Sequence, residues 1–273
     1  MSGSAVSSYE SGALGLSLLG RHDSLAAASQ ALPEGAYTTL RTYGGRGVVR
    51  LGQHVARLEE SAALKGTPGR VDPALLRRAL SEALDRSSFP ESRVRLTFAP
   101  PRLFVAVEAF TPLPSRLYAE GVACVTLELQ RENPHAKDTR FIATARQAYA
   151  RLPEGVEEGL LVAPDGAVLE GLSSNFFAIR EGALRTEDAR ALAGVTRALA
   201  IEVAASLLPV RPVAIRREEL PLVDEAFITS VSREVLPVVR VDGRPVGDGR
   251  VGPRTSGVMQ SFAALVARER ETL

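Results

Sequence analysis

The order of segments between residues 158 and 208 constrains the fold of this chain more than any other feature. "EGLLVAPDGAVLEG" reads as a strand, a turn at Asp165-Gly166 and a second strand. "NFFAIREGALRT" reads as another hairpin, which turns at Glu181-Gly182. Gly194 then precedes "VTRALAIEVAASLL", whose apolar pattern predicts a helix. This half of the chain is therefore expected to combine antiparallel strands with packed helices.

The N-terminal half has the same mixed character. "GAYTTLRTY" reads as a strand that turns at "GGRG" and returns as "VVRL" in a hairpin, and "RVRLTFA" and "RLFVAVEAF" read as alternating strands. "GQHVARLEESAALKG" and "DPALLRRALSEALDR" read as helices, the second with Asp72 as N-cap and Pro73 at its first position. The prolines of "TPLPSR" indicate a boundary. We expect an N-terminal α+β lobe at 1–113, a linker at 114–119 and a second lobe at 120–273.

Composition excludes several classes of function. The chain of 273 residues has a formal net charge of +1, which gives no reason to expect nucleic acid or an anionic membrane as a partner. No apolar run approaches the roughly 20 residues of a membrane helix. One cysteine and three dispersed histidines exclude a disulfide framework and leave little for a metal site, so no metal is expected.

Lysine is rare in this chain. Lys and Arg together number 33, yet only Lys65 and Lys137 are lysines. A deprotonated amine can form an imine with an aldehyde, which requires a lowered lysine pKa. Lys137, within "ENPHAKDTRF", is therefore a candidate catalytic residue, and the alternative is a solvated loop lysine. Lys65, in the last turn before "GTPG", is interpreted as such a solvated residue.

Three further patterns become informative beside Lys137. Gly194 and the Thr196 hydroxyl at a helix start suit a phosphate, although an ordinary capped helix also explains them. Arg57 could bind phosphate or pair with a glutamate on a solvated helix face. Glu170 leaves an apolar strand and could bond a protonated ring nitrogen or pair with an arginine. A lysine, a carboxylate, an arginine and a phosphate-binding helix start are together the requirements for pyridoxal 5′-phosphate.

With these residues in place, the chain resembles the fold-type IV (class IV) pyridoxal-phosphate enzymes, which include branched-chain aminotransferase, D-amino acid aminotransferase and aminodeoxychorismate lyase. The resemblance runs from about residue 35 to 262, and its most specific element is "LEGLSSNFFAIREGALRTEDARALAGVTRALAIEVA" at 169–204. "HVARLEESA" is similar to the family's phosphate-arginine segment, which gives that role to Arg57. Alignment back from Glu170 without a gap places the family's Schiff-base lysine on Lys137. The resemblance implies an α+β fold with a small N-terminal lobe and a larger C-terminal pseudo-barrel lobe.

The resemblance also implies the remaining site residues. Leu192 would pack on the cofactor ring with Ser173 close by, and the N–H groups of Val195 and Thr196 would bind phosphate. "ITSVSREVLPV" matches the segment that closes the phosphate and carboxylate sites, where Val231 replaces a threonine common among relatives. The implied cofactor-binding set is Arg57, Lys137, Glu170, Ser173, Leu192, Val195, Thr196, Ser230 and Val231. The implied substrate-binding set is Arg93, Arg95 and Ser232; Arg93 and Arg95 share one strand face, which could instead be a solvated edge.

The function implied by the resemblance is a transaminase that exchanges an amino group between an amino acid and a 2-keto acid through a Lys137 Schiff base. One alternative is an aminodeoxychorismate lyase-type reaction, and a second is a non-catalytic phosphate-ligand-binding protein on the same fold. Ile142 replaces a tyrosine of the branched-chain enzymes, whereas "SSN" is closer to the D-amino acid type. The donor, the acceptor and the D or L preference stay open. A cytoplasmic homodimer with small-molecule partners is expected.

Overall fold

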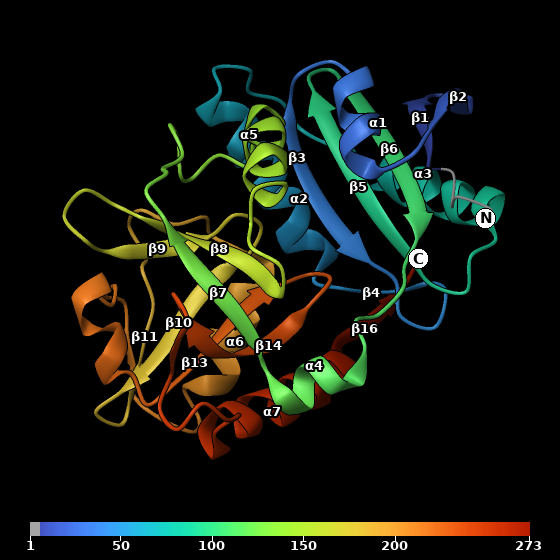
Figure 1. Cartoon of the computed structure of the whole chain (residues 1–273). Helices are drawn as coiled ribbons and strands as arrows, with labels where there is room; N and C mark the ends of the chain where they lie inside the picture. The colour runs from blue at the N-terminus through green and yellow to red at the C-terminus, as the bar shows by residue number, and fades with distance from the viewer. Residues whose placement is uncertain (1–5) are drawn as a thin grey trace. The chain divides into compact units, whose positions relative to one another are not determined.

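The structure is a computed structural model that describes residues 6–273, and it divides into two compact units (Figure 1). The first unit ends its main stretch at Thr111 and also includes residues 136–143 and 269–273, which were expected in the second lobe. The second unit comprises residues 112–135 and 144–268. The predicted linker at 114–119 largely coincides with a short helix, α4 (Ser115–Glu120). Residues 1–5 of the predicted first lobe lie outside the described residues.

The first unit is built on an antiparallel sheet in the order β2-β1-β6-β5-β3. Its strands are β1 (Val6–Gly12), β2 (Gly15–His22), β3 (Ala36–Arg41), β5 (Ser92–Ala99) and β6 (Arg102–Ala109). Helices α2 (Leu51–Leu64) and α3 (Pro73–Ser87) contribute to the core on one face, and α1 (Leu25–Ala31) packs on the other. Residues 6–31, in which the sequence predicts no more than a local helix or strand at 13–20, form a hairpin and a helix.

Side-chain alternation explains why the two faces of this sheet differ. Val94, Leu96 and Phe98 of β5 are buried in the core with α2 and α3, so the intervening Arg93 and Arg95 point to the α1 face. The α3 helix begins as predicted, because the Asp72 carboxylate accepts the N–H groups of Ala74 and Leu75 at 2.8 and 3.1 Å.

The predicted hairpin of "GAYTTLRTY" and "VVRL" is wrong. Only an isolated bridge between Tyr43 and Gly47 links these segments, and β3 pairs instead with β5. The returning strand β4 (Gly47–Val49) pairs with the C-terminal strand β16 (Arg270–Thr272). A partner more than 200 residues away leaves no local pattern, whereas the short turn "GGRG" has the composition of a hairpin turn.

The segment that carries Lys137 is docked on β3, the end strand of this sheet. An antiparallel bridge joins Ala36 to Asp138, and the Tyr37 N–H donates to the Lys137 carbonyl at 2.8 Å. Gly35 exchanges two hydrogen bonds with Thr139, one to its hydroxyl and one from its N–H, each at 3.2 Å. Backbone pairing thus fixes residues 137–139 by the same means as a strand in a sheet.

The second unit contains strands that close into a ring. Strand pairing runs β10-β13-β14-β7-β8-β9, and a further pairing of Asn175 with Glu170 returns from β9 to β10. The bounds are β7 (Val122–Leu127), β8 (Val156–Val162), β9 (Val168–Gly171), β10 (Asn175–Arg180), β13 (Glu225–Ser230) and β14 (Glu234–Val241). This ring confirms the expected pseudo-barrel. The two hairpins predicted from Asp165-Gly166 and Glu181-Gly182 are confirmed as β8–β9 and β10–β11 (Ala183–Arg185).

Helices and short elements complete the second unit. They are α6 (Val195–Ala204), α7 (Pro253–Glu269, of which the last residue belongs to the first unit), the 3-10 turn η1 (Arg217–Leu222), β12 (Val210–Arg211) and β15 (Arg244–Pro245). Helix α5 (Arg140–Tyr149) begins in residues of the first unit and ends in the second. Among the described residues no helix is long and apolar enough to cross a membrane.

Candidate active site

The site residues predicted from sequence fall into two groups, one in each unit. Lys137, Arg57, Arg93 and Arg95 belong to the first unit. The second unit holds the other predicted residues, Glu170, Ser173, Leu192, Val195, Thr196, Ser230, Val231 and Ser232. Each group is described within its own unit.

Helix α2 presents a row of polar side chains toward the Lys137 segment. His54, Arg57, Ser61 and Lys65 are spaced three, four and four residues apart, which places them on one helical face. His54, Arg57 and Ser61 are buried. The Ser61 hydroxyl accepts the Lys137 N–H at 3.1 Å. The α2 face therefore brings Arg57 and the Lys137 backbone to one part of the unit.

Arg57 is held by a buried hydrogen-bond chain rather than on a solvated face. Its Nη2 donates to the Thr38 hydroxyl at 2.7 Å, and that oxygen lies 2.8 Å from His54 Nδ1. Burial lowers the pKa of His54 well below its ordinary value of 6.5, and the positive charges of Arg57 and Lys137 lower it further. His54 is consequently neutral, and its Nδ1 shares one hydrogen bond with the Thr38 hydroxyl.

Tyr37 links Lys137 to one of the two arginines predicted to bind substrate. The Lys137 Nζ lies 4.8 Å from the Tyr37 ring centroid, and the Arg95 guanidinium carbon lies 4.9 Å from it. Arg95 donates to the Leu25 carbonyl at 3.0 Å and to the Ser29 hydroxyl at 2.8 Å, so α1 holds it in place. Arg93 pairs instead with Glu108. The structure therefore places Arg95, but not Arg93, beside the same ring as Lys137.

In the second unit, Glu170 is a carboxylate with 2% exposure at the end of β9. Its Oε2 accepts the Leu192 N–H at 3.2 Å and the Asn175 amide at 3.4 Å, and its Oε1 lies 2.8 Å from Arg131 Nε. These donors favour the ionised carboxylate. The arginine pairing considered from sequence is thus present, and one oxygen of Glu170 faces the Leu192 turn.

Asn175 fixes the start of α6 relative to Glu170. Its amide also donates to the Leu192 carbonyl at 2.9 Å, and a Cβ at Gly194 would lie 2.3 Å from its Oδ1. Gly194 is the N-cap of α6, and no side chain caps this helix. The first turn carries Val195 and Thr196, as predicted. A helix start with no side-chain cap offers N–H groups and a positive dipole end to an anion.

A second polar network surrounds Glu158 of β8, which is fully buried. Its carboxylate accepts the Tyr149 hydroxyl at 2.6 Å and the Ser174 hydroxyl at 2.9 Å, and Arg233 Nη1 lies 3.3 Å from it. Burial alone would lower the pKa of Arg233, but the carboxylates Glu158 and Glu157 raise it above its usual value. Burial together with the charge of Glu158 also raises the pKa of Tyr149.

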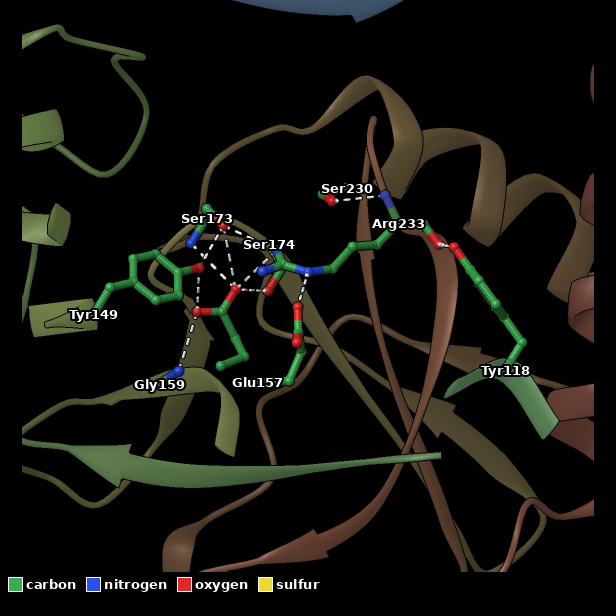
Figure 2. A network of polar contacts seen from close by, with 9 residues as sticks. Tyr118, Tyr149, Glu157, Gly159, Ser173, Ser174, Ser230 and Arg233 are labelled. Carbon is green, nitrogen blue, oxygen red and sulfur yellow. Dashed lines mark hydrogen bonds and ion pairs between the residues drawn. The ribbon is translucent and has the colours of Figure 1, made fainter. Parts of the chain in front are cut away.

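This network contacts two segments that contain predicted site residues, at Ser173 and at Ser230. The Ser173 hydroxyl contacts the Tyr149 hydroxyl at 2.5 Å and accepts Arg233 Nη1 at 3.0 Å (Figure 2). The Arg233 N–H donates to the Ser230 hydroxyl at 3.2 Å, which shapes the turn of Val231 and Ser232. Arg233 therefore ties Ser173 to the β13–β14 turn within the second unit.

Sequence reasoning missed several residues of these networks, namely Tyr37, Thr38, His54, Ser61, Arg131, Tyr149, Glu158, Asn175 and Arg233. Only two carried a usable signal. His54 lies three residues before Arg57 on the same helix, and Asn175 stands in the quoted "SSNFF" motif. The arginines are too numerous to be singled out by composition, and the hydroxyl residues act only through distant partners.

Comparison with known proteins agrees with this architecture. The model of the family described as amino-transferase class IV matches residues 35–241. The chain is 29% identical over 255 residues to a branched-chain-amino-acid aminotransferase of Escherichia coli (strain K12), covering 84% of this chain and 82% of that protein. It is 28% identical over 253 residues to a D-alanine aminotransferase of Bacillus licheniformis, covering 86% and 89%.

Solved structures show the same fold. The putative branched-chain amino acid aminotransferase of Thermotoga maritima superposes with a TM-score of 0.79 at 24% identity, covering 96% of each chain. The Escherichia coli branched-chain enzyme superposes with a TM-score of 0.74 at 26% identity, covering 87% of each chain. The fold and the matched residues define a class IV aminotransferase. The chain belongs to the amino-transferase class IV family, which confirms the resemblance inferred from its sequence.

A third solved structure contains a form of the expected cofactor. It is a branched-chain amino acid aminotransferase with pyridoxamine 5′-phosphate, and it superposes with a TM-score of 0.80 at 24% identity. The alignment covers 97% of this chain and 95% of that chain. A further structure of the same enzyme is a complex with N-(5′-phosphopyridoxyl)-L-glutamate.

Proposed function

We propose that this chain is a pyridoxal 5′-phosphate-dependent transaminase that moves an amino group between an amino acid and a 2-keto acid, with Lys137 as the lysine that bonds the cofactor. The observation that carries the proposal is the placement of Lys137. This rare lysine is fixed by backbone pairing to β3 and to Ser61, on the α2 face that also carries the buried Arg57.

The residues present fit this cofactor by their chemistry. Lys137 offers an amine for an aldehyde, and Arg57 offers a guanidinium for a phosphate. In the second unit Glu170 is a buried carboxylate that pairs with Arg131 and suits a protonated ring nitrogen, and α6 begins without a side-chain cap. The two solved structures that contain pyridoxamine 5′-phosphate and N-(5′-phosphopyridoxyl)-L-glutamate share this fold, which supports the same ligand class here.

The proposed roles follow from these groups. When bound, pyridoxal phosphate supplies an aldehyde for the amino group and an aromatic ring that withdraws electrons from the substrate Cα. The Lys137 amine would move the proton at the substrate Cα. Glu170 keeps the ring nitrogen protonated, and Leu192 packs against the ring. Arg57 and the first turn of α6, with Val195 and Thr196, hold the phosphate.

For the remaining predicted residues we propose the roles that the family resemblance implies. Ser173 lies near the ring, and the turn of Ser230, Val231 and Ser232 closes the phosphate and carboxylate sites. Arg93 and Arg95 are proposed to bind the substrate carboxylate. Of the two, Arg95 has the stronger support, because it shares the Tyr37 ring with Lys137, whereas Arg93 pairs with Glu108.

Borohydride reduction tests the lysine assignment directly. Reduction of the protein with pyridoxal phosphate should leave a pyridoxyl group on the peptide that contains Lys137. Lys137→Ala should abolish it, and Lys65→Arg should retain it as the matched control. Because the chain has two lysines, peptide mapping leaves no ambiguity. Label on another peptide, or a protein that stays colourless with the cofactor, would refute the proposal.

The absorption spectrum identifies the reaction. A yellow band with pyridoxal phosphate should bleach with one of L-leucine, L-glutamate or D-alanine added separately, and the donor that acts reports chirality and side-chain class. A band that none of them bleaches would contradict transamination of these donors. We extend the proposal to a homodimer, as the family resemblance implies; a monomer mass by light scattering would contradict this.

A further inference from the structure

Lys65, the second lysine of this chain, forms an ion pair with the residue that directly follows Lys137. The Lys65 ammonium lies 2.5 Å from the Asp138 carboxylate, and both side chains are only 11% exposed. Asp138 directly follows Lys137 in the sequence. Lys65 is therefore not the solvated residue that the sequence suggested. In a chain rich in arginine, one of the two lysines lies in this segment and the other binds to it.

The last turn of α2 holds this segment at two successive residues. Ser61 accepts the backbone N–H of Lys137, and Lys65, the C-cap of α2, binds the side chain of Asp138. Ser61 and Lys65 are four residues apart, so both point in the same direction from the helix. Together with the pairing to β3, these contacts fix the backbone from which the Lys137 side chain extends.

The Asp138 carboxylate is ionised, and two cations, Lys65 and Arg140, pair with it. Arg140 contributes its Nε to Oδ2 at 2.7 Å and its backbone N–H to Oδ1 at 3.0 Å. Burial opposes ionisation of Asp138, but the hydrogen bonds from Lys65 and Arg140 keep its pKa below the ordinary value. Two cations thus neutralise the carboxylate of the residue that directly follows Lys137 in the sequence.

We propose that Lys65 is a positioning residue for Lys137: through Asp138 it anchors the segment and cancels the negative charge of the residue that directly follows Lys137. The proposal rests on the proposed function, in which Lys137 must lose its proton to react.

The charge argument predicts opposite effects for the two partners. Lys65→Met removes a cation and leaves more negative potential at Lys137, which favours its ammonium form. Asp138→Asn removes the anion, keeps Lys65 and Arg140, and disfavours that form. A purely structural role would make both variants behave alike. In this unit Lys137 also lies near Tyr37 and near the neutral His54, on which Arg57 acts as well, and neither variant changes these three residues.

The experiment is competitive labelling of amines in the cofactor-free protein with acetic anhydride across a pH series, followed by peptide mapping. With only two lysines, the labelling midpoint of Lys137 can be read separately. It should move to higher pH in Lys65→Met and to lower pH in Asp138→Asn. Lys65→Arg keeps the charge and should leave it near the wild-type position. Arg70→Met, which removes one cation from an exposed pair with Glu59, is the matched control and should leave it unchanged.

Ligand affinity supplies a second readout. Lys65→Met should weaken pyridoxal and pyridoxal phosphate by a similar factor, because both need Lys137 and only one carries phosphate. An unmoved midpoint in Lys65→Met, or midpoints that move in the same direction in both variants, would overturn the proposal. If Lys65→Met does not fold, Asp138→Asn decides alone, since an unchanged or raised midpoint there refutes it. Failure of wild-type borohydride labelling at Lys137 would instead refute the proposed function.

Discussion

Substitution of Thr38 by valine should weaken the binding of pyridoxal phosphate without weakening the binding of pyridoxal. Valine keeps the shape of threonine and removes the hydroxyl that accepts Arg57 Nη2 at 2.7 Å and bonds His54 Nδ1 at 2.8 Å. An arginine donates only, so the Thr38 hydroxyl oxygen accepts from Arg57, and the same hydroxyl bonds His54. Without the hydroxyl, the guanidinium loses the contact that sets its orientation.

The magnitude follows from the charged hydrogen bond that an oriented Arg57 would make to phosphate. Such a bond contributes about 1.5–3 kcal/mol, or roughly 10- to 150-fold in Kd. Arg57→Met should show the full loss. Thr38→Val acts only through orientation and should show part of it, close to tenfold, while Thr38→Ser should restore wild-type affinity. Because the two residues act together, the double variant should bind no more weakly than Arg57→Met alone.

Absorbance titration of the cofactor-free protein with each ligand provides the measurement. The control ligand is pyridoxal, which lacks the phosphate and should bind Thr38→Val and wild type equally. Equal losses for the two ligands would mean that Thr38 affects the whole site rather than Arg57. An unchanged Kd for pyridoxal phosphate would refute the orienting role of the hydroxyl.

Three further outcomes are expected from the buried polar groups. Arg233→Met should lower the free energy of unfolding in urea by about 3–5 kcal/mol, because the fully buried Glu158 loses its cation; Arg233→Lys should lose less, and an equal loss would contradict the pairing. Gly194→Ala should weaken cofactor binding, because its Cβ would lie 2.3 Å from Asn175 Oδ1; unchanged affinity would show that the turn can yield. The pKa of His54 is lowered in the folded state, so its contribution to the free energy of unfolding should be fully present above about pH 6.5. Below that pH the free energy of unfolding should fall by at most about 1.4 kcal/mol per pH unit. Denaturation curves at pH 5 to 7 would check this, and His54→Gln should flatten the dependence.

Local signals predicted much of the fold. The β10–β11 hairpin turns at Glu181 and Gly182, which adopt φ angles of 51° and 73°, and this left-handed geometry is what a Glu-Gly turn between apolar runs suggests. Asp72 and Pro73 likewise start α3 where capping rules place them. These features depend on residues close in the chain, so the sequence contains what is needed to find them.

Long-range partners were not predictable in this way. The pairing of β4 with β16 and the docking of residues 136–139 on β3 depend on segments about 100 or more residues apart. The same holds for the site. Lys137 stood out because lysine is rare, but the interpretation of Lys65 was wrong, because only the fold brings Asp138 to the end of α2. Glu170 was singled out because a carboxylate at the end of a buried strand needs a partner, whereas the partner itself, Arg131, was one arginine among many.

The docking of the Lys137 segment on β3 also limits how this protein can be divided. A fragment that ends at Thr111 would contain most of the first unit in one continuous stretch. It would nevertheless lack residues 136–139 and strand β16, which cover β3 and pair with β4. Both strands would then present unpaired backbone groups, which promote association between chains. Lys137 thus belongs to a unit that is completed only after the chain has begun the other one, so a cut at the apparent linker would not yield two self-sufficient modules.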